Sequence, residues 1–245
     1  KKFSPNVLVR ISWMRPGLDD DARWKEFWEF VQDWSSRLAP KRLMRNANIQ
    51  WTAQKGFPII HTRSIAREFN AMHGITIGES SSVPRHPHQK WRNPGLSHLN
   101  IYVLSSYMRD NKQDLKKLLD EYYALFYGPA SNEMRAAFDF AEKVYPREEK
   151  PMSSRISYTD RLEFVELLYK AKAKAGDTIY GKRVKLIIDE LQPLEELRER
   201  SAMAEARGEV VEFPFMHPME RRGKAAETFK LDGRLDELFW TDYYH

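Results

Sequence analysis

The residue best placed to do chemistry is Glu79, which directly follows the short strand-like run of residues 74–78. A carboxylate at the end of a strand can hydrogen-bond a sugar hydroxyl or support a reacting pair of carboxyl groups. The competing interpretation is an ordinary loop glutamate that forms a salt bridge or caps a helix. Glycosidic hydrolysis usually needs two carboxylates on opposite sides of the bond, and the sequence offers Glu79 no convincing partner.

Two tryptophans and two polar residues occupy comparable positions near the ends of predicted strands, and a further polar residue, His61, lies in the loop-to-helix region after Pro58. An indole there can stack on the apolar face of a sugar ring, or it can simply pack beneath neighbouring loops. The polar side chains can contact a ligand on the same side, or they can have structural roles. The sequence therefore predicts a substrate-binding set and assigns no catalytic residue; the set is Glu79, Trp13, Arg15, Asn48, Trp51 and His61.

Other site chemistries find little support. The chain has no cysteine, which excludes disulfides, thiolate metal sites and cysteine nucleophiles. His86, His88 and His98 invite a metal interpretation, but no carboxylate or thiolate completes a ligand set. The sequence contains neither a Gly-x-Ser-x-Gly elbow nor a Gly-x-Gly-x-x-Gly loop, so neither a serine hydrolase nor a nucleotide site is indicated. We expect no metal and no cofactor.

Composition narrows the class of partner. Lys and Arg total 40 against 35 Asp and Glu, a net charge of +5, and the charges are interspersed along the chain. A nucleic-acid-binding protein would more often show a concentrated basic stripe. No stretch approaches the roughly 20 apolar residues that a membrane span requires. We therefore expect a carbohydrate partner, no nucleic acid and no membrane span, while the oligomeric state stays open.

The predicted elements would place these residues along the edge of a parallel sheet. Strand-like and helical patterns alternate up to about residue 110, which is typical of βα units. In a TIM barrel the chemistry lies where the strands end and the loops begin, and closure takes about eight strands. Three strands therefore mean either a small open sheet or part of a larger barrel. The strands are expected at residues 6–11, 42–51 and 74–78, and the helices at 19–38 and 60–72.

From about residue 96 the pattern becomes purely helical. Gly128-Pro129 should interrupt it, Ser131 can cap the following helix, and Pro193 should kink or divide the last one, expected near residues 179–200. Residues 204–226 mix glycine, proline and charge, as a linker does. We expect four parts: barrel units over 1–110, a helical extension over 111–203, a linker over 204–228, and the start of another module over 229–245.

Several stretches together resemble one bacterial family. They are Pro5-Asn6-Val7, Asp33-Trp34-Ser35, Gly74 to Glu79, and Glu121 to Ala130 with its Tyr127-Gly128-Pro129 core. The family is called domain of unknown function 4838, and the resemblance covers roughly residues 5–147. It implies a glycoside-hydrolase-type TIM barrel. Some members are grouped as glycoside hydrolase family 163, which acts on N-acetylglucosamine linkages in N-glycans.

A second resemblance lies at the other end of the chain. Leu231 to Trp240, with Asp232-Gly233 and Leu235-Asp236, is similar to the opening strand of family 9 carbohydrate-binding modules. Only about the first 15 residues of such a β-sandwich are present, so this segment by itself is expected to bind nothing.

These resemblances lead to one expected fold and several open functions. The expected fold is α/β, the C-terminal portion of a (β/α)8 barrel followed by an all-helical extension. The expected protein is a secreted, periplasmic or cell-surface glycoside hydrolase whose acid/base pair lies upstream of this chain, because the family's Asn-Asp-type motif has no counterpart here. The alternatives are a non-catalytic carbohydrate-binding or scaffolding protein, and a helical interaction module joined to an unrelated α/β piece.

Overall fold

A computed structural model describes residues 2–13, 15, 17–48, 57–82, 94–145 and 158–191. All of them belong to the unit that spans residues 1–208. The predicted linker and the predicted start of a sugar-binding module, over residues 204–245, lie outside the described residues. The same is true of Trp51, His86 and His88.

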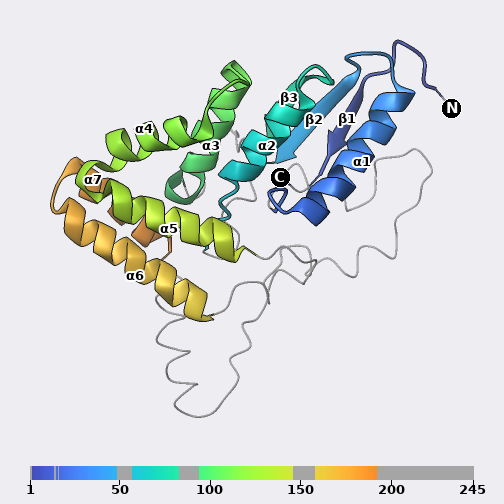
Figure 1. Cartoon of the computed structure of the whole chain (residues 1–245). Coiled ribbons are helices and arrows are strands. Elements are labelled where there is room, and N and C mark those ends of the chain that lie inside the picture. The colour runs from blue at the N-terminus through green and yellow to red at the C-terminus, as the bar shows by residue number, and fades with distance from the viewer. Residues whose placement is uncertain are drawn as a thin grey trace, which may run out of the picture. The chain divides into compact units, whose positions relative to one another are not determined.

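The first half of the described chain is a three-stranded parallel sheet with two connecting helices (Figure 1). The strands lie in the order β1, β2, β3, and each is joined to the next through a helix. This confirms the predicted alternation and the parallel pairing. The elements are β1 (Val9–Ser12), α1 (Asp21–Arg37), β2 (Leu43–Asn48), α2 (Thr62–Met72) and β3 (Thr76–Ser82).

Helix α1 forms where its cap and its apolar spacing agree. The Asp20 carboxylate accepts hydrogen bonds from the backbone N–H groups of Ala22 and Arg23, which fixes the start of the helix. Phe27 and Val31, one helical turn apart, are fully buried against the sheet. The core of this half consists of Ile11, Leu18, Phe27, Val31, Leu38, Leu43 and Met72.

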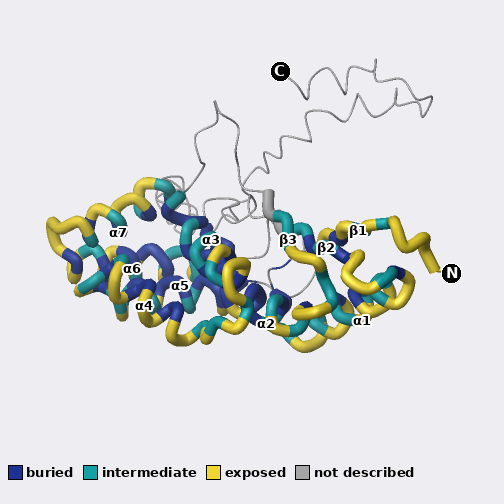
Figure 2. The backbone as a smooth tube through the Cα atoms, turned by 90° about the horizontal axis from the view of Figure 1, so that it is seen from above, coloured by how far each residue is buried: buried dark blue, intermediate teal, exposed yellow. Residues whose placement is uncertain are grey.

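Both helices cover the same face of the sheet. The strand register aligns Ile11, Arg45 and Glu79, so their side chains share one face. On that face the Arg45 guanidinium lies 5.5 Å from the ring centre of Phe27 in α1 and forms a salt bridge to Glu68 in α2. Residues of β1 that point to the other face are exposed (Figure 2).

The prediction of a portion of an eight-stranded barrel is wrong. Within the described residues the sheet has three strands, and every described element after β3 is helical. The physical reason is the change in apolar spacing from residue 94 onward. Side chains that recur every three or four residues form one face of a helix, and they bury that face against other helices rather than extending the sheet.

The second half is a set of helices packed on one another. The predicted break at Gly128-Pro129 is confirmed as a short 3-10 turn over Gly128–Ala130. The prediction that Ser131 caps the next helix is wrong, because Ser131 is its first residue and Ala130 precedes it without a side-chain cap. The helices are α3 (Pro94–Arg109), α4 (Leu115–Tyr127), α5 (Ser131–Val144), α6 (Tyr158–Ala175) and α7 (Ile179–Glu190).

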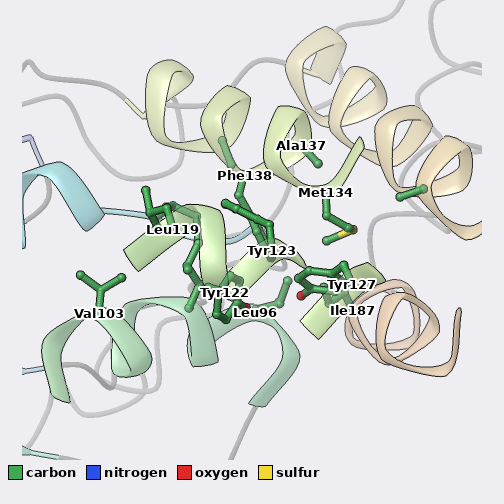
Figure 3. Close-up of a cluster of buried hydrophobic side chains, with 14 of the residues drawn as sticks. Leu96, Val103, Leu119, Tyr122, Tyr123, Tyr127, Met134, Ala137, Phe138 and Ile187 are labelled. Carbon is green, nitrogen blue, oxygen red and sulfur yellow. The ribbon is translucent and has the colours of Figure 1, made fainter. Parts of the chain in front are cut away.

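Aromatic side chains of α4 lie at the centre of this helical half (Figure 3). Tyr122, Tyr123 and Tyr127 are each exposed by 4% or less. The ring of Phe138 from α5 lies with its centre 6.4 Å from those of Tyr123 and Tyr127. Other helices complete the cluster with smaller apolar side chains, such as Ile187 from α7. This packing makes the helical half a single core.

The turn between α6 and α7 depends on glycine. A Cβ atom added at Gly181 would lie 2.0 Å from the backbone oxygen of Gly176, which leaves no space for a side chain. Gly176 itself has φ of 63°, a left-handed conformation that glycine adopts most easily. The two glycines therefore allow α7 to start close against the end of α6.

Two glutamates, the buried Glu142 and the half-buried Glu190, bind helix N-termini that are distant from them in sequence. Glu142 in α5 accepts hydrogen bonds from the Thr62 hydroxyl and the Arg63 backbone N–H at the start of α2. Glu190 in α7 accepts from the backbone N–H groups of Gly95 and Leu96 at the start of α3. Carboxylates are favoured at these positions because helix N-termini carry unpaired donors and partial positive charge.

None of the helices in the described ranges is long and apolar enough to cross a membrane.

Candidate functional site

The most unusual feature of the sheet half is a buried network of two arginines and two glutamates. We call Arg15, Arg45, Glu68 and Glu79 the ion network. Their side chains are exposed by 4% or less. Charged side chains are rarely buried so completely unless they are paired. Arg45 comes from β2, Glu68 from α2 and Glu79 from β3, and Arg15 lies in the loop after β1.

Glu68 holds the network together. Its carboxylate accepts from Arg15 Nε at 2.9 Å and from Arg15 Nη2 at 3.2 Å. On the other side it accepts from Arg45 Nε and Nη2. Arg45 also donates to the backbone oxygens of Trp13 and Asn46, so its guanidinium is engaged on several sides. Each guanidinium therefore binds Glu68 through two nitrogens, which fixes its orientation.

Arg15 also joins Glu79, and this contact links two of the predicted site residues. Arg15 Nη2 donates to Glu79 Oε2 at 2.8 Å. The sequence predicts that Glu79 follows a strand, whereas it is the fourth residue of β3, on the face of the sheet that carries the helices. The salt bridge is the alternative role that the sequence left open for this glutamate. We call the two residues the Arg15–Glu79 pair.

The two carboxyl groups of the network differ electrostatically. Burial raises the pKa of Glu68, but the guanidiniums of Arg15 and Arg45 outweigh burial and hold that pKa well below its usual range. Burial also raises the pKa of Glu79, and there the guanidinium of Arg15 only partly opposes it. Glu68 is therefore firmly ionised and structural, whereas Glu79 is the carboxyl group whose charge responds to its surroundings.

The Arg15–Glu79 pair carries two buried polar atoms without a partner among the described residues. One is the donor Arg15 Nη1 and the other is the acceptor Glu79 Oε1. A buried polar atom without a hydrogen bond costs about 1–3 kcal/mol, so such atoms usually bind water or a ligand. The salt bridge therefore leaves one donor on Arg15 and one acceptor on Glu79 that the described residues do not satisfy.

His61 lies beside this network and is buried. Its Nδ1 is 3.1 Å from the backbone oxygen of Ile59, so Nδ1 carries the proton and Nε2 is left as an acceptor. Its backbone N–H donates to Asn100 Oδ1 at 3.1 Å. Burial, followed by the nearby charge of Arg15, lowers the pKa of His61 to about 3. The ring therefore stays neutral across the physiological range.

A neutral buried histidine makes the fold sensitive to acid. Its folded pKa of about 3 lies below the ordinary value of 6.5, so the unfolded chain binds the proton first as the pH falls. The contribution of His61 to the free energy of unfolding is complete above pH 6.5. It is lost as the pH falls from 6.5 to 3, at up to about 1.4 kcal/mol per pH unit. We expect His61→Gln to flatten the pH dependence of the free energy of unfolding in that window.

Urea denaturation of both proteins from pH 7 to pH 4 measures this difference. His98, whose pKa burial and Arg183 lower to about 4, contributes equally to both proteins, so it cancels in the comparison. Parallel pH profiles for the two proteins would contradict the role assigned to His61.

The other predicted site residues are placed as follows. The Trp13 ring is half-buried and packs against Phe27 and Phe30 of α1, at centre distances of 6.0 and 5.0 Å, while its backbone oxygen accepts from Arg45. Asn48 is the last residue of β2, and Trp51 lies outside the described residues. The structure therefore brings together Arg15 and Glu79, with His61 nearby.

Two members of the network were missed by sequence reasoning, and both carry a recognisable signal. Arg45 is two residues from the buried Leu43, so both share the core face of β2. Glu68 lies three residues after Ile65 and four before Met72, on the apolar face of α2. Burying one charged residue without a partner costs much free energy. The presence of Arg45 and Glu68, of opposite charge, on two apolar faces therefore indicates that they pair with each other.

The described residues offer no metal-binding cluster. Nowhere in the ranges that the structure covers do three His, Asp, Glu or Cys side chains gather to hold an ion. Of the three histidines considered above, His98 lies in α3 and contacts Tyr122 and Phe126. Every carboxylate of the ion network is already bound to a guanidinium.

Comparison with known proteins gives no relatives: no family model, curated protein or solved structure matches this chain.

Proposed function

We propose that this chain binds carbohydrate at the Arg15–Glu79 pair and contributes this binding to a protein that acts on glycans. The observation that carries the proposal is that two buried atoms, the donor Arg15 Nη1 and the acceptor Glu79 Oε1, have no partner among the residues that the structure describes. A hydroxyl group both donates and accepts, so neighbouring hydroxyls of one sugar ring can satisfy both atoms. The contacts to Glu68 hold Arg15 in one orientation before the ligand arrives, which lowers the entropic cost of binding.

A role in hydrolysis rests on the family resemblance alone. It implies a glycoside hydrolase, secreted or at the cell surface, that cleaves N-acetylglucosamine-containing linkages with an acid/base pair upstream of this chain. A binding role agrees with the network, because Glu68 is held ionised by two guanidiniums and is a poor proton donor. A non-catalytic carbohydrate-binding protein is the second candidate, supported by the same unpartnered atoms. An assay for reducing sugar released from a bound glycan distinguishes the hydrolase from the non-catalytic binding protein.

Binding of neutral glycans by the purified chain tests the proposal. We expect Glu79→Gln to weaken the binding of any neutral glycan that the chain retains by at least about tenfold, because one charge-assisted hydrogen bond is lost. Glu190→Gln is the matched control: it changes another glutamate whose pKa is raised by burial, but one that accepts from the backbone of α3. Titration calorimetry gives the affinities, and circular dichroism checks the fold.

The alternative occupant is an ordered water molecule, since buried waters also satisfy unpaired polar atoms. In that case neither the original chain nor the variants bind any glycan, and the proposal fails. Equal loss of affinity in Glu79→Gln and Glu190→Gln would also count against it, because it would indicate a general loss of structure.

A further inference from the structure

We infer that the Arg15–Glu79 pair selects neutral, hydroxyl-rich ligands and rejects both anionic and cationic ones. This inference rests on the proposed carbohydrate function and adds the chemical class of the glycan. It follows from the charges of the ion network and from the types of the two atoms, Arg15 Nη1 and Glu79 Oε1, that find no partner within the described ranges.

The network is electrically balanced without a ligand. Arg15 and Arg45 contribute two positive charges, and Glu68 and Glu79 contribute two negative charges, so the sum is zero. Arg15 alone contacts both carboxylates. Its charge is therefore already compensated, and the pair does not offer a free cation as an anion-binding site would.

An anionic group fits the pair poorly. A carboxylate or sulfate can accept from Arg15 Nη1, but it has no proton to donate to Glu79 Oε1. The acceptor would then stay unsatisfied beside a second negative charge, in a position where both side chains are exposed by only 3–4%. Burial weakens the screening by water, so the repulsion between the two anions is strong there.

A cationic group fails for the converse reason. An ammonium group can donate to Glu79 Oε1, but it has no lone pair to accept from Arg15 Nη1. It would also lie close to the guanidinium that Glu79 already binds at 2.8 Å. Only a neutral ligand that presents a donor and an acceptor side by side, such as two neighbouring hydroxyls, satisfies both atoms without adding charge.

Matched glycans test this selectivity. The probes are neutral oligosaccharides on an array, each beside a version with one uronic acid or sulfate ester and a version with one free amino group. We expect the chain to bind the neutral member of a matched set at least about tenfold more tightly than either charged member, the effect of one unmade hydrogen bond to a buried group.

A variant should change this preference in a defined direction. Glu79→Gln removes the negative charge and introduces an amide nitrogen, so the pair gains a second donor and the network a net charge of +1. We expect its neutral-to-anionic affinity ratio to fall at least about tenfold, with tighter binding of the anionic member. A purely structural role of Glu79 would lower both affinities alike and leave their ratio unchanged.

The outcomes separate this inference from the proposed function. If no glycan of any class binds, the carbohydrate function fails and the inference fails with it. If the original chain binds anionic or cationic members as tightly as neutral ones, the carbohydrate function stands and the inference is overturned. The comparison within matched sets uses only the original chain, so it decides the question even if the variant does not fold.

Discussion

Replacing Glu68 with glutamine is expected to lower the free energy of unfolding by about 3–5 kcal/mol, the usual effect of removing one partner of a buried ion pair. Glu68 is 1% exposed and is the group that both Arg15 and Arg45 bind. Its loss leaves two buried guanidiniums with only the Glu79 carboxylate to compensate them. Because domains are stable by only about 5–15 kcal/mol, the variant should be close to unfolding. Urea denaturation followed by tryptophan fluorescence measures the change.

Two comparisons show whether the effect comes from uncompensated charge. Glu29→Gln changes a glutamate of α1 that is 64% exposed and lies 3.9 Å from Lys25, and it should change stability by less than about 0.5 kcal/mol. The double variant Arg45→Met with Glu68→Met restores the charge balance and should recover more than half of the loss, since apolar side chains can replace a buried ion pair. A loss below 1 kcal/mol in Glu68→Gln, by contrast with the estimate of about 3–5 kcal/mol, would contradict the assigned role.

Replacing Phe138 with alanine is expected to destabilise the protein by about 3–5 kcal/mol, through lost burial and the cavity that remains. Phe138 is 1% exposed and packs against Tyr123 and Tyr127, which joins α5 to α4 (Figure 3). The aromatic neighbours are large and held by other contacts, so they can fill little of the space. Thermal unfolding followed by far-UV circular dichroism measures the loss of helix.

The matched control lies on the outer face of α4. Leu125 is 69% exposed, so Leu125→Ala removes apolar atoms without leaving a cavity and should change stability by less than about 0.5 kcal/mol. Similar effects from Phe138→Ala and Leu125→Ala would show that the packing around Tyr123 and Tyr127 is not the core of the helical half.

Much of the fold could be predicted because local patterns determine secondary structure. The spacing of Trp24, Phe27 and Val31 predicts one helix, and Gly128-Pro129 predicts a break that the structure contains. The parallel pairing follows from strands that alternate with helices. Local patterns could not decide between a small open sheet and part of a barrel. Three strands and their connecting helices give the same sequence pattern in both folds. That choice depends on which further elements pair with the edge strands.

The candidate site was predicted in part. Arg15 and Glu79 attracted attention by their residue types, and the structure joins them through a salt bridge. Their partners Arg45 and Glu68 were missed. A charged residue within an apolar pattern is normally interpreted as exposed to solvent, unless a partner of opposite charge is known to lie beside it. Arg15 and Glu68 are 53 residues apart in the chain, a separation at which sequence alone gives no distance.

The sequence by itself determined the order of the helices and strands and the break at Gly128-Pro129, though not the exact strand bounds, because secondary structure depends largely on contacts within a few residues. It also excluded cysteine chemistry outright. Only the tertiary structure decided that the sheet has three strands in the described residues, and that four charged side chains from three elements and a loop meet on one face of it. The physical reason is that the free energy of a buried charge is set by partners distant in sequence, and folding alone brings those partners within hydrogen-bond reach.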